Sequence, residues 1–353
     1  MLGASLYLSE GSQKNIEYIK RMNKVGIIKV FTSLHIPEDD TSKTLNVLKD
    51  ITRLMDELSM ELIPDISSGT IAQYGLTKEN AISFFKNLQI KTLRIDYGFT
   101  FEEIKEFSKE FNIVLNASVI DEKYYEELRR VELDSSEITV CHNFYPRENT
   151  GLDRNFFIER NRYLKMKGFN IIAFIAGNKD KRGPVFAGLP TLEEHRYLEP
   201  LEAYLDLTDK CLVDEVLIGD ISISDPSLTK LMKYLKEDII VLPIKDVQEN
   251  LLPENFYSVH TNRKDVAADV IRGTESRIIL KDQIIQPGNC KERRIGSVTI
   301  DNSVYGRYAG EIQVSKRDLP FDSRVNVLAT VKEEYLGLLP YIGPARKFQF
   351  NAE

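Results

Sequence analysis

Short apolar runs that alternate with amphipathic stretches restrict the possible folds of this chain more than any other feature. Eight runs rich in Ile, Val, Leu and Phe occur before residue 237, and helical periodicity follows each one, in the last but one only after a long loop. The runs are ASLYLSE, IIKVFTSLHIPEDD, MELIPDIS, KTLRIDYGF, NIVLNAS, ITVCHNFYP, FNIIAFIAG and DEVLIGDISIS. Such runs are typical of parallel strands covered by helices, and eight of them predict a closed (β/α)8 barrel. An open doubly wound sheet is the alternative, but no run leads into GxGxxG or a P-loop.

The pattern changes after residue 238. SRIIL, IGSVTID, GEIQVSK and RVNVLATV read as short strands separated by Gly, Asn, Asp and Pro, and only 264–271 has a helical pattern. A chain of 353 residues also exceeds the size at which one core keeps growing. We therefore predict a TIM-like catalytic barrel over residues 1–237 and a small, mostly antiparallel β domain over residues 238–353.

Charge and motif content exclude several classes of protein. The net charge of −7 argues against nucleic-acid binding, which needs a dense basic surface. Residues 1–7 lack the basic lead of a signal peptide, and runs such as 171–176 are too short to span a bilayer. Cys141, Cys211 and Cys290 have neither zinc-site nor disulfide-framework spacing. We expect a cytoplasmic protein with no membrane partner, no metal and no cofactor.

Carboxylates stand at four of the predicted strand ends. In (β/α)8 enzymes the chemistry lies at the C-terminal ends of the strands and in the loops that follow them. Glu10, Asp65, Asp96 and Asp220 occupy such positions. A group of carboxylates allows one to hold a proton while another stays ionised. We predict that these four do acid/base work, with helix caps and salt bridges as the alternative.

Other polar side chains share the strand ends: Thr32, Ser33, His35, Arg94, Asn116, His142, Asn143, Tyr145 and Arg147. Arg94 and Asp96 point to one face of their strand, which suits an ion pair or a joint grip on substrate. If the strand persists, His142 and Asn143 point to opposite faces, so only one faces the barrel axis. Arg147 offers a planar fork for phosphate or carboxylate, unless it makes a salt bridge within its loop.

Two further regions have residues suited to binding an anion. The Gly- and Pro-punctuated loop 177–196 is long enough to be a functional lid, and its cations at 179, 181 and 182 either meet an anion or are solvated. In the second domain, two Gly turns are bracketed by Arg272, Thr274, Arg277, Tyr305 and Arg307. Each turn presents a guanidinium and a hydroxyl to a ligand, or is ordinary hairpin chemistry. If this domain caps the barrel mouth, these residues bind substrate.

An ordered series of motifs resembles a known family. SLYLSE, VFTSLHIPED, IPDIS, TLRIDYGF, LNAS, CHNFYPRENTGLD, FAGLPTLEEHR, DEVLIGDISIS and YGRYAGEIQV look like the bacterial 6-phospho-N-acetylmuramidases, once labelled outer surface proteins. The resemblance spans nearly the whole chain, and its most specific part is 142–153. It implies a TIM-like barrel with a cyclophilin-like β domain. It also implies cytoplasmic cleavage of the β-1,4 bond of N-acetylmuramic acid 6-phosphate–N-acetylglucosamine in peptidoglycan recycling.

The leading hypothesis is therefore a glycosidase that acts on a phosphorylated amino-sugar disaccharide. Glycoside hydrolysis usually needs one carboxylic acid and one carboxylate. We favour Asp96 and Asp220 for this pair, with Glu10 and Asp65 orienting the sugar. Substrate-assisted catalysis by the acetamido oxygen stays open. Phosphate and lactyl carboxylate would meet arginines, the candidates being Arg147, Arg272, Arg277 and Arg307.

Two alternatives belong to other classes. A sugar-phosphate aldolase or isomerase on the same barrel would be favoured by a lysine at a strand end, and the eight ends have none. The β domain could instead be a partner-binding module in a protein that is no enzyme. The sequence makes no prediction about the oligomeric state.

Overall fold

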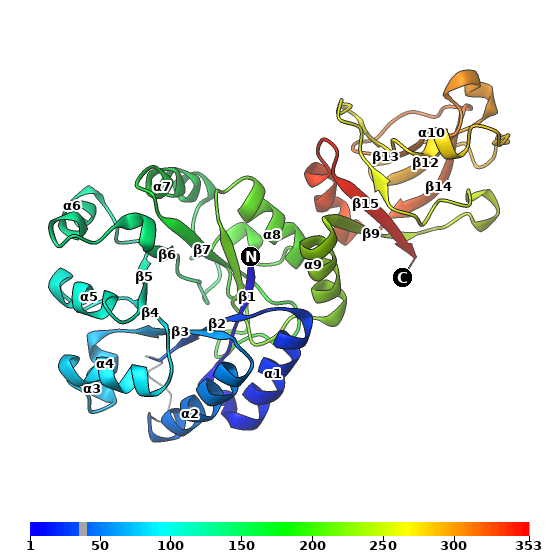
Figure 1. The fold of residues 1–353 in the computed structure, drawn as a ribbon. Helices are drawn as coiled ribbons and strands as arrows, with labels where there is room; N and C mark the ends of the chain where they lie inside the picture. The colour runs from blue at the N-terminus through cyan, green and yellow to red at the C-terminus, as the bar shows by residue number, and fades with distance from the viewer. Residues whose placement is uncertain (35–40, 353) are drawn as a thin grey trace. The chain divides into compact units, whose positions relative to one another are not determined.

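The computed structural model describes residues 1–34 and 41–352. It divides into two units, Met1–Ser224 and Asp225–Glu353, each with its own packing. In Figure 1 the first unit runs from blue to green and the second from green to red. None of the helices in the described part of the chain combines the length and the apolar character needed to cross a bilayer.

The first unit is a closed barrel of eight parallel strands (Figure 1). The strands are β1 (Leu2–Ser5), β2 (Lys29–Ser33), β3 (Glu61–Ile66), β4 (Thr92–Ile95), β5 (Asn112–Asn116), β6 (Thr139–Cys141), β7 (Asn170–Ile175) and β8 (Glu215–Ile218). The ring closes because β1 pairs in parallel with both β2 and β8. The predicted (β/α)8 barrel is confirmed, and the open sheet is excluded.

Helices connect the strands on the outside of the ring. They are α1 (Gly11–Val25), α2 (Thr41–Glu57), α3 (Ser68–Gln73), α4 (Lys78–Asn87), α5 (Phe101–Ser108), α6 (Glu122–Arg130), α7 (Arg154–Met166) and α8 (Pro200–Asp209), with 3-10 turns η1 (Leu8–Glu10), η2 (Ser135–Glu137) and η3 (Glu193–His195). Side chains of Thr77, Thr100 and Asp153 accept hydrogen bonds from the third residue of the helix that each one caps. Such caps satisfy backbone N–H groups that have no partner inside the helix, so they define where the loop before each of these helices ends.

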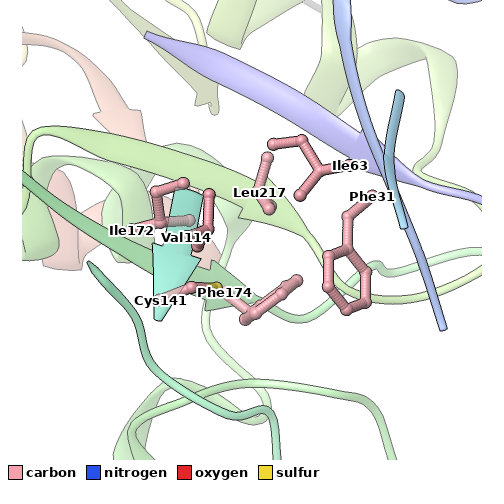
Figure 2. Packing of buried hydrophobic residues seen from close by; sticks show 7 residues of the cluster. All are labelled: Phe31, Ile63, Val114, Cys141, Ile172, Phe174 and Leu217. Atoms are coloured by element: carbon pink, nitrogen blue, oxygen red, sulfur yellow. The ribbon is translucent and has the colours of Figure 1, made fainter. Parts of the chain in front are cut away.

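The barrel interior is filled by apolar side chains. Figure 2 shows the cluster formed by Phe31, Ile63, Val114, Cys141, Ile172, Phe174 and Leu217, all nearly inaccessible to solvent. Phe31 meets Phe174 edge to face at 5.2 Å between ring centroids, and Phe144 packs against both rings. A filled interior leaves the chemistry to the rim, where the polar strand ends lie.

The second unit is a seven-stranded sheet in the order β10-β15-β9-β14-β12-β13-β11. Its elements are α9 (Asp225–Glu237), β9 (Ile239–Lys245), η4 (Glu249–Leu251), β10 (His260–Thr261), β11 (Val270–Arg272), α10 (Ser276–Ile279), β12 (Ser297–Asp301), η5 (Ser303–Tyr308), β13 (Ile312–Ser315), β14 (Val325–Val331), η6 (Glu333–Tyr341) and β15 (Lys347–Ala352). Within the described part of this unit, up to residue 352, only the β9–β15 pair is parallel. The mostly antiparallel β domain is confirmed, and its cyclophilin-like identity stays a prediction.

Two local predictions in this unit are wrong. SRIIL, predicted as a strand, forms the short helix α10, and 264–271, predicted as a helix, is a loop that leads into β11. The buried Ser276 hydroxyl donates to the Gly273 carbonyl and accepts from the Ile312 backbone N–H. This bonding bends the chain away from the sheet, and most of Ile278 is left exposed. The apolar residues of SRIIL alone do not predict that bend.

Candidate active site at the barrel mouth

The strand ends of the barrel surround a cavity of about 350 Å³. It is lined by Phe31, Ser33, Asp65, Arg94, Asp96, His142, Asn143, Phe144, Tyr145, Phe174 and Arg182. These residues come from the C-terminal ends of β2, β3, β4, β6 and β7 and from the segment after β7. The volume falls within the range of small-molecule sites. We refer to this space as the barrel cavity.

Arg94 is the buried cation of the barrel cavity. Its Nη1 donates to Asp65 Oδ1 at 2.5 Å, and its Nη2 donates to Asn143 Oδ1 at 2.5 Å. The residue is 2% exposed, and a guanidinium so deep in the protein is costly unless it is paired. Burial by itself lowers the pKa of Arg94, but the charges and hydrogen bonds of its neighbours, Asp65 foremost, together outweigh burial and the pKa rises. One permanently charged guanidinium thus ties β3 and β4 to the segment after β6.

Asp96 is the more accessible carboxylate of the cavity. Its Oδ1 accepts a hydrogen bond from Asn116 Nδ2 at 2.7 Å and lies 3.8 Å from Arg94 Nη1. The amide oxygen of Asn116 in turn accepts from the Ser118 backbone N–H at 2.9 Å, which sets the orientation of the amide. The Asp96 side chain is 17% exposed, against 6% for Asp65. Asp65 is therefore held by the arginine, while Asp96 faces the cavity space.

His142 and Asn143 point in different directions. His142 is buried, its Nε2 lies 2.7 Å from Asn161 Oδ1, and its ring packs on Phe157 of α7. The amide of Asn161 donates to the Cys211 carbonyl, so its oxygen accepts from His142. Burial lowers the pKa of His142 to about 4, which leaves the ring neutral near pH 7. Asn143, not His142, meets the cavity arginine.

Tyr145 completes this side of the barrel cavity. Its backbone N–H donates to the Pro190 carbonyl at 3.0 Å, which holds the segment after β6 in place. Burial raises the pKa of Tyr145, so the hydroxyl stays protonated at neutral pH and can donate to a ligand.

Asp220 lies beneath the loop that follows β7 and does not line the barrel cavity. Its carboxylate accepts from the backbone N–H groups of Gly177 at 2.8 Å, Leu189 at 3.0 Å and Arg182 at 3.2 Å. Burial raises the pKa of Asp220, and the three N–H groups act against that rise. The arrangement fixes both ends of the loop. It also positions Arg182, whose guanidinium lies 4.8 Å over the ring of Tyr7.

Asn116, Glu10 and Arg147 are also predicted site residues outside the cavity lining, although Asn116 orients Asp96. Glu10 pairs with Lys14 one turn along α1 and borders a separate hollow. Arg147 is exposed, and its carbonyl accepts from the Arg196 guanidinium. His35 lies outside the described residues.

The predicted residues of the second unit gather around a cavity of their own. Three of them line it, Thr274, Arg277 and Arg307. Arg272 makes a bidentate pair with Glu311 at 2.6 and 3.0 Å. The ring of Tyr305 lies under the guanidinium of Arg324 at 4.4 Å. This set forms no part of the barrel cavity lining.

One group in the described part of the chain has the spacing of a metal site. Ligand atoms of Glu194, His195 and Asp206 lie within 4.8 Å of one another. The guanidinium of Arg154 is hydrogen-bonded to both carboxylates. An arginine thus stands where a metal cation would need to bind.

Sequence reasoning missed the aromatic wall of the cavity. Phe31, Phe144 and Phe174 line it together. Strict alternation along β6 would send Phe144 to the same side as His142, but the strand ends at Cys141 and the alternation ends with it. Arg182 was predicted only as one cation of a basic loop, because its place depends on how the Asp220 carboxylate holds that loop.

Comparisons with known proteins agree with this architecture. The family model described as 6-phospho-N-acetylmuramidase, N-terminal, matches residues 2–233, and the corresponding C-terminal model matches residues 240–351. No curated protein matches the chain.

Two solved structures are similar over nearly their whole length. A conserved protein of unknown function from Enterococcus faecalis is 35% identical, with a TM-score of 0.90, and the match covers 100% of this chain and 96% of that one. An uncharacterized B. cereus protein is 30% identical, with a TM-score of 0.80 and 99% of both chains covered. The two family models together span both units, and each of the two solved structures does so by itself. The chain therefore belongs to the 6-phospho-N-acetylmuramidase family and is a glycosidase.

Proposed function

We propose that this glycosidase hydrolyses the β-1,4 bond of N-acetylmuramic acid 6-phosphate–N-acetylglucosamine at the barrel cavity. The observation that carries the proposal is a pair of carboxylates, Asp65 and Asp96, in one cavity and both next to Nη1 of the buried Arg94. Glycoside hydrolysis uses two carboxyl groups in different environments. The family description supports the choice of substrate. A cytoplasmic role in peptidoglycan recycling rests on the family resemblance alone.

The two carboxylates have different roles in this proposal. Asp96 has room to meet the substrate and protonates the leaving glycosidic oxygen. Asp65 stays ionised beside Arg94 and stabilises the positive charge that develops on the sugar ring. Because Asn143 and Asp65 hold both ends of the guanidinium, this charge pattern exists before substrate binds. The acetamido group of the substrate can supply the attacking oxygen, and an ionised Asp65 would also stabilise that intermediate.

Other lining residues account for recognition. Arg182 presents a planar fork to the 6-phosphate, and its stacking on Tyr7 limits its motion. Phe31, Phe144 and Phe174 give an apolar wall for the ring face and methyl groups of the sugar. Asp220 enters the proposal as a positioning residue for the Arg182 loop, and Asp65 takes the place in the catalytic pair that the sequence predicted for Asp220.

The chemistry of the lining disfavours the aldolase alternative. No lysine is among the described residues that line the barrel cavity. Schiff-base catalysis needs such an amine next to the reacting carbonyl. The hydrolytic proposal therefore fits the cavity better.

Substrate preference tests the proposal directly. Purified protein is given the 6-phosphorylated disaccharide and the unphosphorylated one, and release of N-acetylglucosamine is followed. A charged hydrogen bond to phosphate contributes about 1.5–3 kcal/mol. We therefore expect kcat/KM to be at least about tenfold higher with the phosphate. Equal values for both disaccharides would contradict the phosphate-recognition part.

The role of Asp96 is tested with two leaving groups. Asp96→Asn should reduce turnover of the disaccharide by about a thousandfold, the usual weight of a general acid. A nitrophenyl glycoside of the same phosphosugar needs no protonation, so its cleavage should be reduced far less. Glu106→Gln, an exposed carboxylate on α5, is the matched control and should leave both rates unchanged. Equal losses with both substrates would exclude Asp96 as the acid.

A further inference from the structure

The second unit contains a cavity of about 990 Å³ that the proposed function does not use. Segments 261–265, 273–285 and 303–311 supply most of its lining. The lining includes five cationic side chains, Arg263, Lys264, Arg277, Lys281 and Arg307. Its carboxylates are two, Asp265 and Glu311. We call this space the sheet cavity, and its lining is strongly positive although the whole chain is acidic.

Both carboxylates of the sheet cavity are already engaged. Glu311 is 3% exposed and makes the bidentate pair with Arg272, a residue outside the lining. Asp265 pairs with Arg263 at 2.9 and 3.0 Å. Glu311 Oε2 also lies 3.8 Å from Arg277 Nη1, so Arg277 shares this carboxylate with Arg272. The lining still has more cations than carboxylates, and the positive charge that remains lies on Lys281, Lys264, Arg307 and, in part, Arg277. An anionic ligand would balance it.

Arg277 and Arg307 are held in place by one aromatic ring. Their guanidinium carbons lie 5.4 and 4.9 Å from the ring centroid of Tyr308. Arg307 Nη2 donates to the Tyr308 hydroxyl at 2.8 Å, and Arg277 Nη2 donates to the Arg307 carbonyl at 2.7 Å. Planar forks fixed in this way lose little freedom when they bind an oxyanion. Two guanidinium groups fixed side by side match the oxygens of a phosphate group better than a single surface lysine would.

An apolar wall lies beside these cations. Ile278 and Ile284 line the sheet cavity while 70% and 75% exposed. Leu280 and Ile285 continue the same wall. A bare anion gains nothing from apolar side chains, whereas a pyranose ring has an apolar C–H face that packs on them. Ser303 and Thr274 add hydroxyl groups that can bond to sugar hydroxyls.

We propose that the sheet cavity is a second ligand site that binds a phosphorylated sugar. The phosphate meets Arg277, Arg307 and Lys281, and the ring lies on the isoleucine wall. This site uses no residue of the barrel cavity. It goes beyond the proposed hydrolysis and does not depend on it.

A tryptophan reporter tests the proposal in the full-length protein. The chain has no tryptophan, so Ile284→Trp places a single indole on the cavity wall. Titration with N-acetylglucosamine 6-phosphate should change its fluorescence saturably, and inorganic phosphate should compete at higher concentration. Unphosphorylated N-acetylglucosamine should bind at least about tenfold more weakly, because a charged hydrogen bond is worth about 1.5–3 kcal/mol. Equal binding of both sugars would overturn the phosphate assignment.

Variants in the reporter background locate the ligand. Arg277→Ala and the exposed Lys281→Glu should each weaken binding about tenfold or more. Arg317→Ala removes an exposed guanidinium outside the lining and should leave the dissociation constant unchanged. Lys281 is exposed, so the result of Lys281→Glu stands even if Arg277→Ala does not fold. No saturable signal up to about 10 mM, or equal binding in both variants, would overturn the proposal.

The two proposals fail in different ways. Asp96→Asn should abolish hydrolysis and leave the reporter titration unchanged. Arg182→Ala should weaken substrate binding at the barrel cavity and not at the sheet cavity. If hydrolysis is absent while the reporter binds, only the proposed function fails.

Discussion

The barrel cavity and the sheet cavity both use arginine, but in opposite ways. Arg94 is 2% exposed, and side chains from β3 and the segment after β6 satisfy its ends. Arg277 is 33% exposed at its side chain, stacks on a tyrosine and faces a surplus of positive charge. The first arginine is neutralised inside the protein. The second shares the Glu311 carboxylate with Arg272, and the cluster around it keeps a surplus of positive charge.

The difference shows what burial does to a charge. Inside the barrel, water screens little, so a misplaced charge is expensive and a correctly placed one acts strongly on a transition state. At the sheet cavity, water and salt weaken each ion pair, so affinity comes from several cations together. A buried ion pair holds its charges in one fixed geometry, which suits catalysis. A group of exposed cations suits reversible binding of an anion.

Removing the buried cation should have the largest effect. Arg94→Met leaves the Asp65 carboxylate buried without its partner, and breaking a buried pair in this way costs about 3–5 kcal/mol. Urea unfolding should show this loss in the free energy of unfolding. The exposed Arg129→Met on α6 is the control, with a change within about 0.5 kcal/mol. A small loss for Arg94→Met would mean that water reaches this pair and that the contrast between the cavities is weak.

Asp220 should come next, because it satisfies three backbone N–H groups at once. Asp220→Ala leaves the N–H groups of Gly177, Arg182 and Leu189 without their acceptor, and we expect a loss of about 2–3 kcal/mol. Limited proteolysis within 177–189 should become faster. Asp220→Asn keeps one acceptor oxygen and should lose less. If both variants are as stable as the parent chain, Asp220 does not hold the loop.

The fold was predictable because its signal is repeated. Eight apolar runs at regular spacing allow few solutions, and the rule for strand ends then identified Asp65, Arg94, Asp96 and Asn143 as neighbours. Asp65 and Arg94 lie within β3 and β4, where one residue of register decides the direction of a side chain, and Asp96 and Asn143 follow within two residues of a strand end. Sequence reasoning therefore works best where strands do the positioning.

Loops and strand termini limited the rest of the prediction. The role of Asp220 depends on where the backbone of 177–189 folds, and no local pattern encodes that path. Phe144 reaches the cavity because β6 ends at Cys141. In the second unit, Arg277 and Arg307 meet on Tyr308 through contacts between two loops that are far apart in sequence.

Asp301 tests the comparison with an effect of opposite sign. Burial raises the pKa of this carboxyl to about 7, with Glu311 and Asp322 adding to the rise. In the unfolded chain its pKa is about 3.9. Between pH 4 and pH 7 the unfolded chain therefore loses this proton while the folded protein keeps it, so stability falls as pH rises through this window.

Asp301→Asn should therefore stabilise the protein. At pH 8 we expect a gain on the order of 2 kcal/mol in the free energy of unfolding, and near pH 4 almost no difference. Thermal unfolding at the two pH values measures this directly. Asp282→Asn, an exposed carboxyl in the same unit, should change stability little at either pH. A loss of stability at pH 8 would show that neighbouring groups stabilise the ionised Asp301 carboxylate, as Arg94 pairs with Asp65 in the barrel.

Arg182 should give the smallest effect, because it is the arginine of the barrel that most resembles those of the sheet cavity. It stacks on a tyrosine, as Arg277 does, and no described carboxylate forms a salt bridge with it. Arg182→Ala should raise KM for the phosphorylated disaccharide about tenfold with a smaller change in kcat, since phosphate binds equally in ground and transition states. Arg182→Lys should recover part of that loss, because it keeps the charge but not the fork. A fall in kcat with unchanged KM would place Arg182 in the chemical step. An exposed, stacked arginine would then take part in catalysis, and the contrast between buried catalytic arginines and exposed binding arginines would not hold.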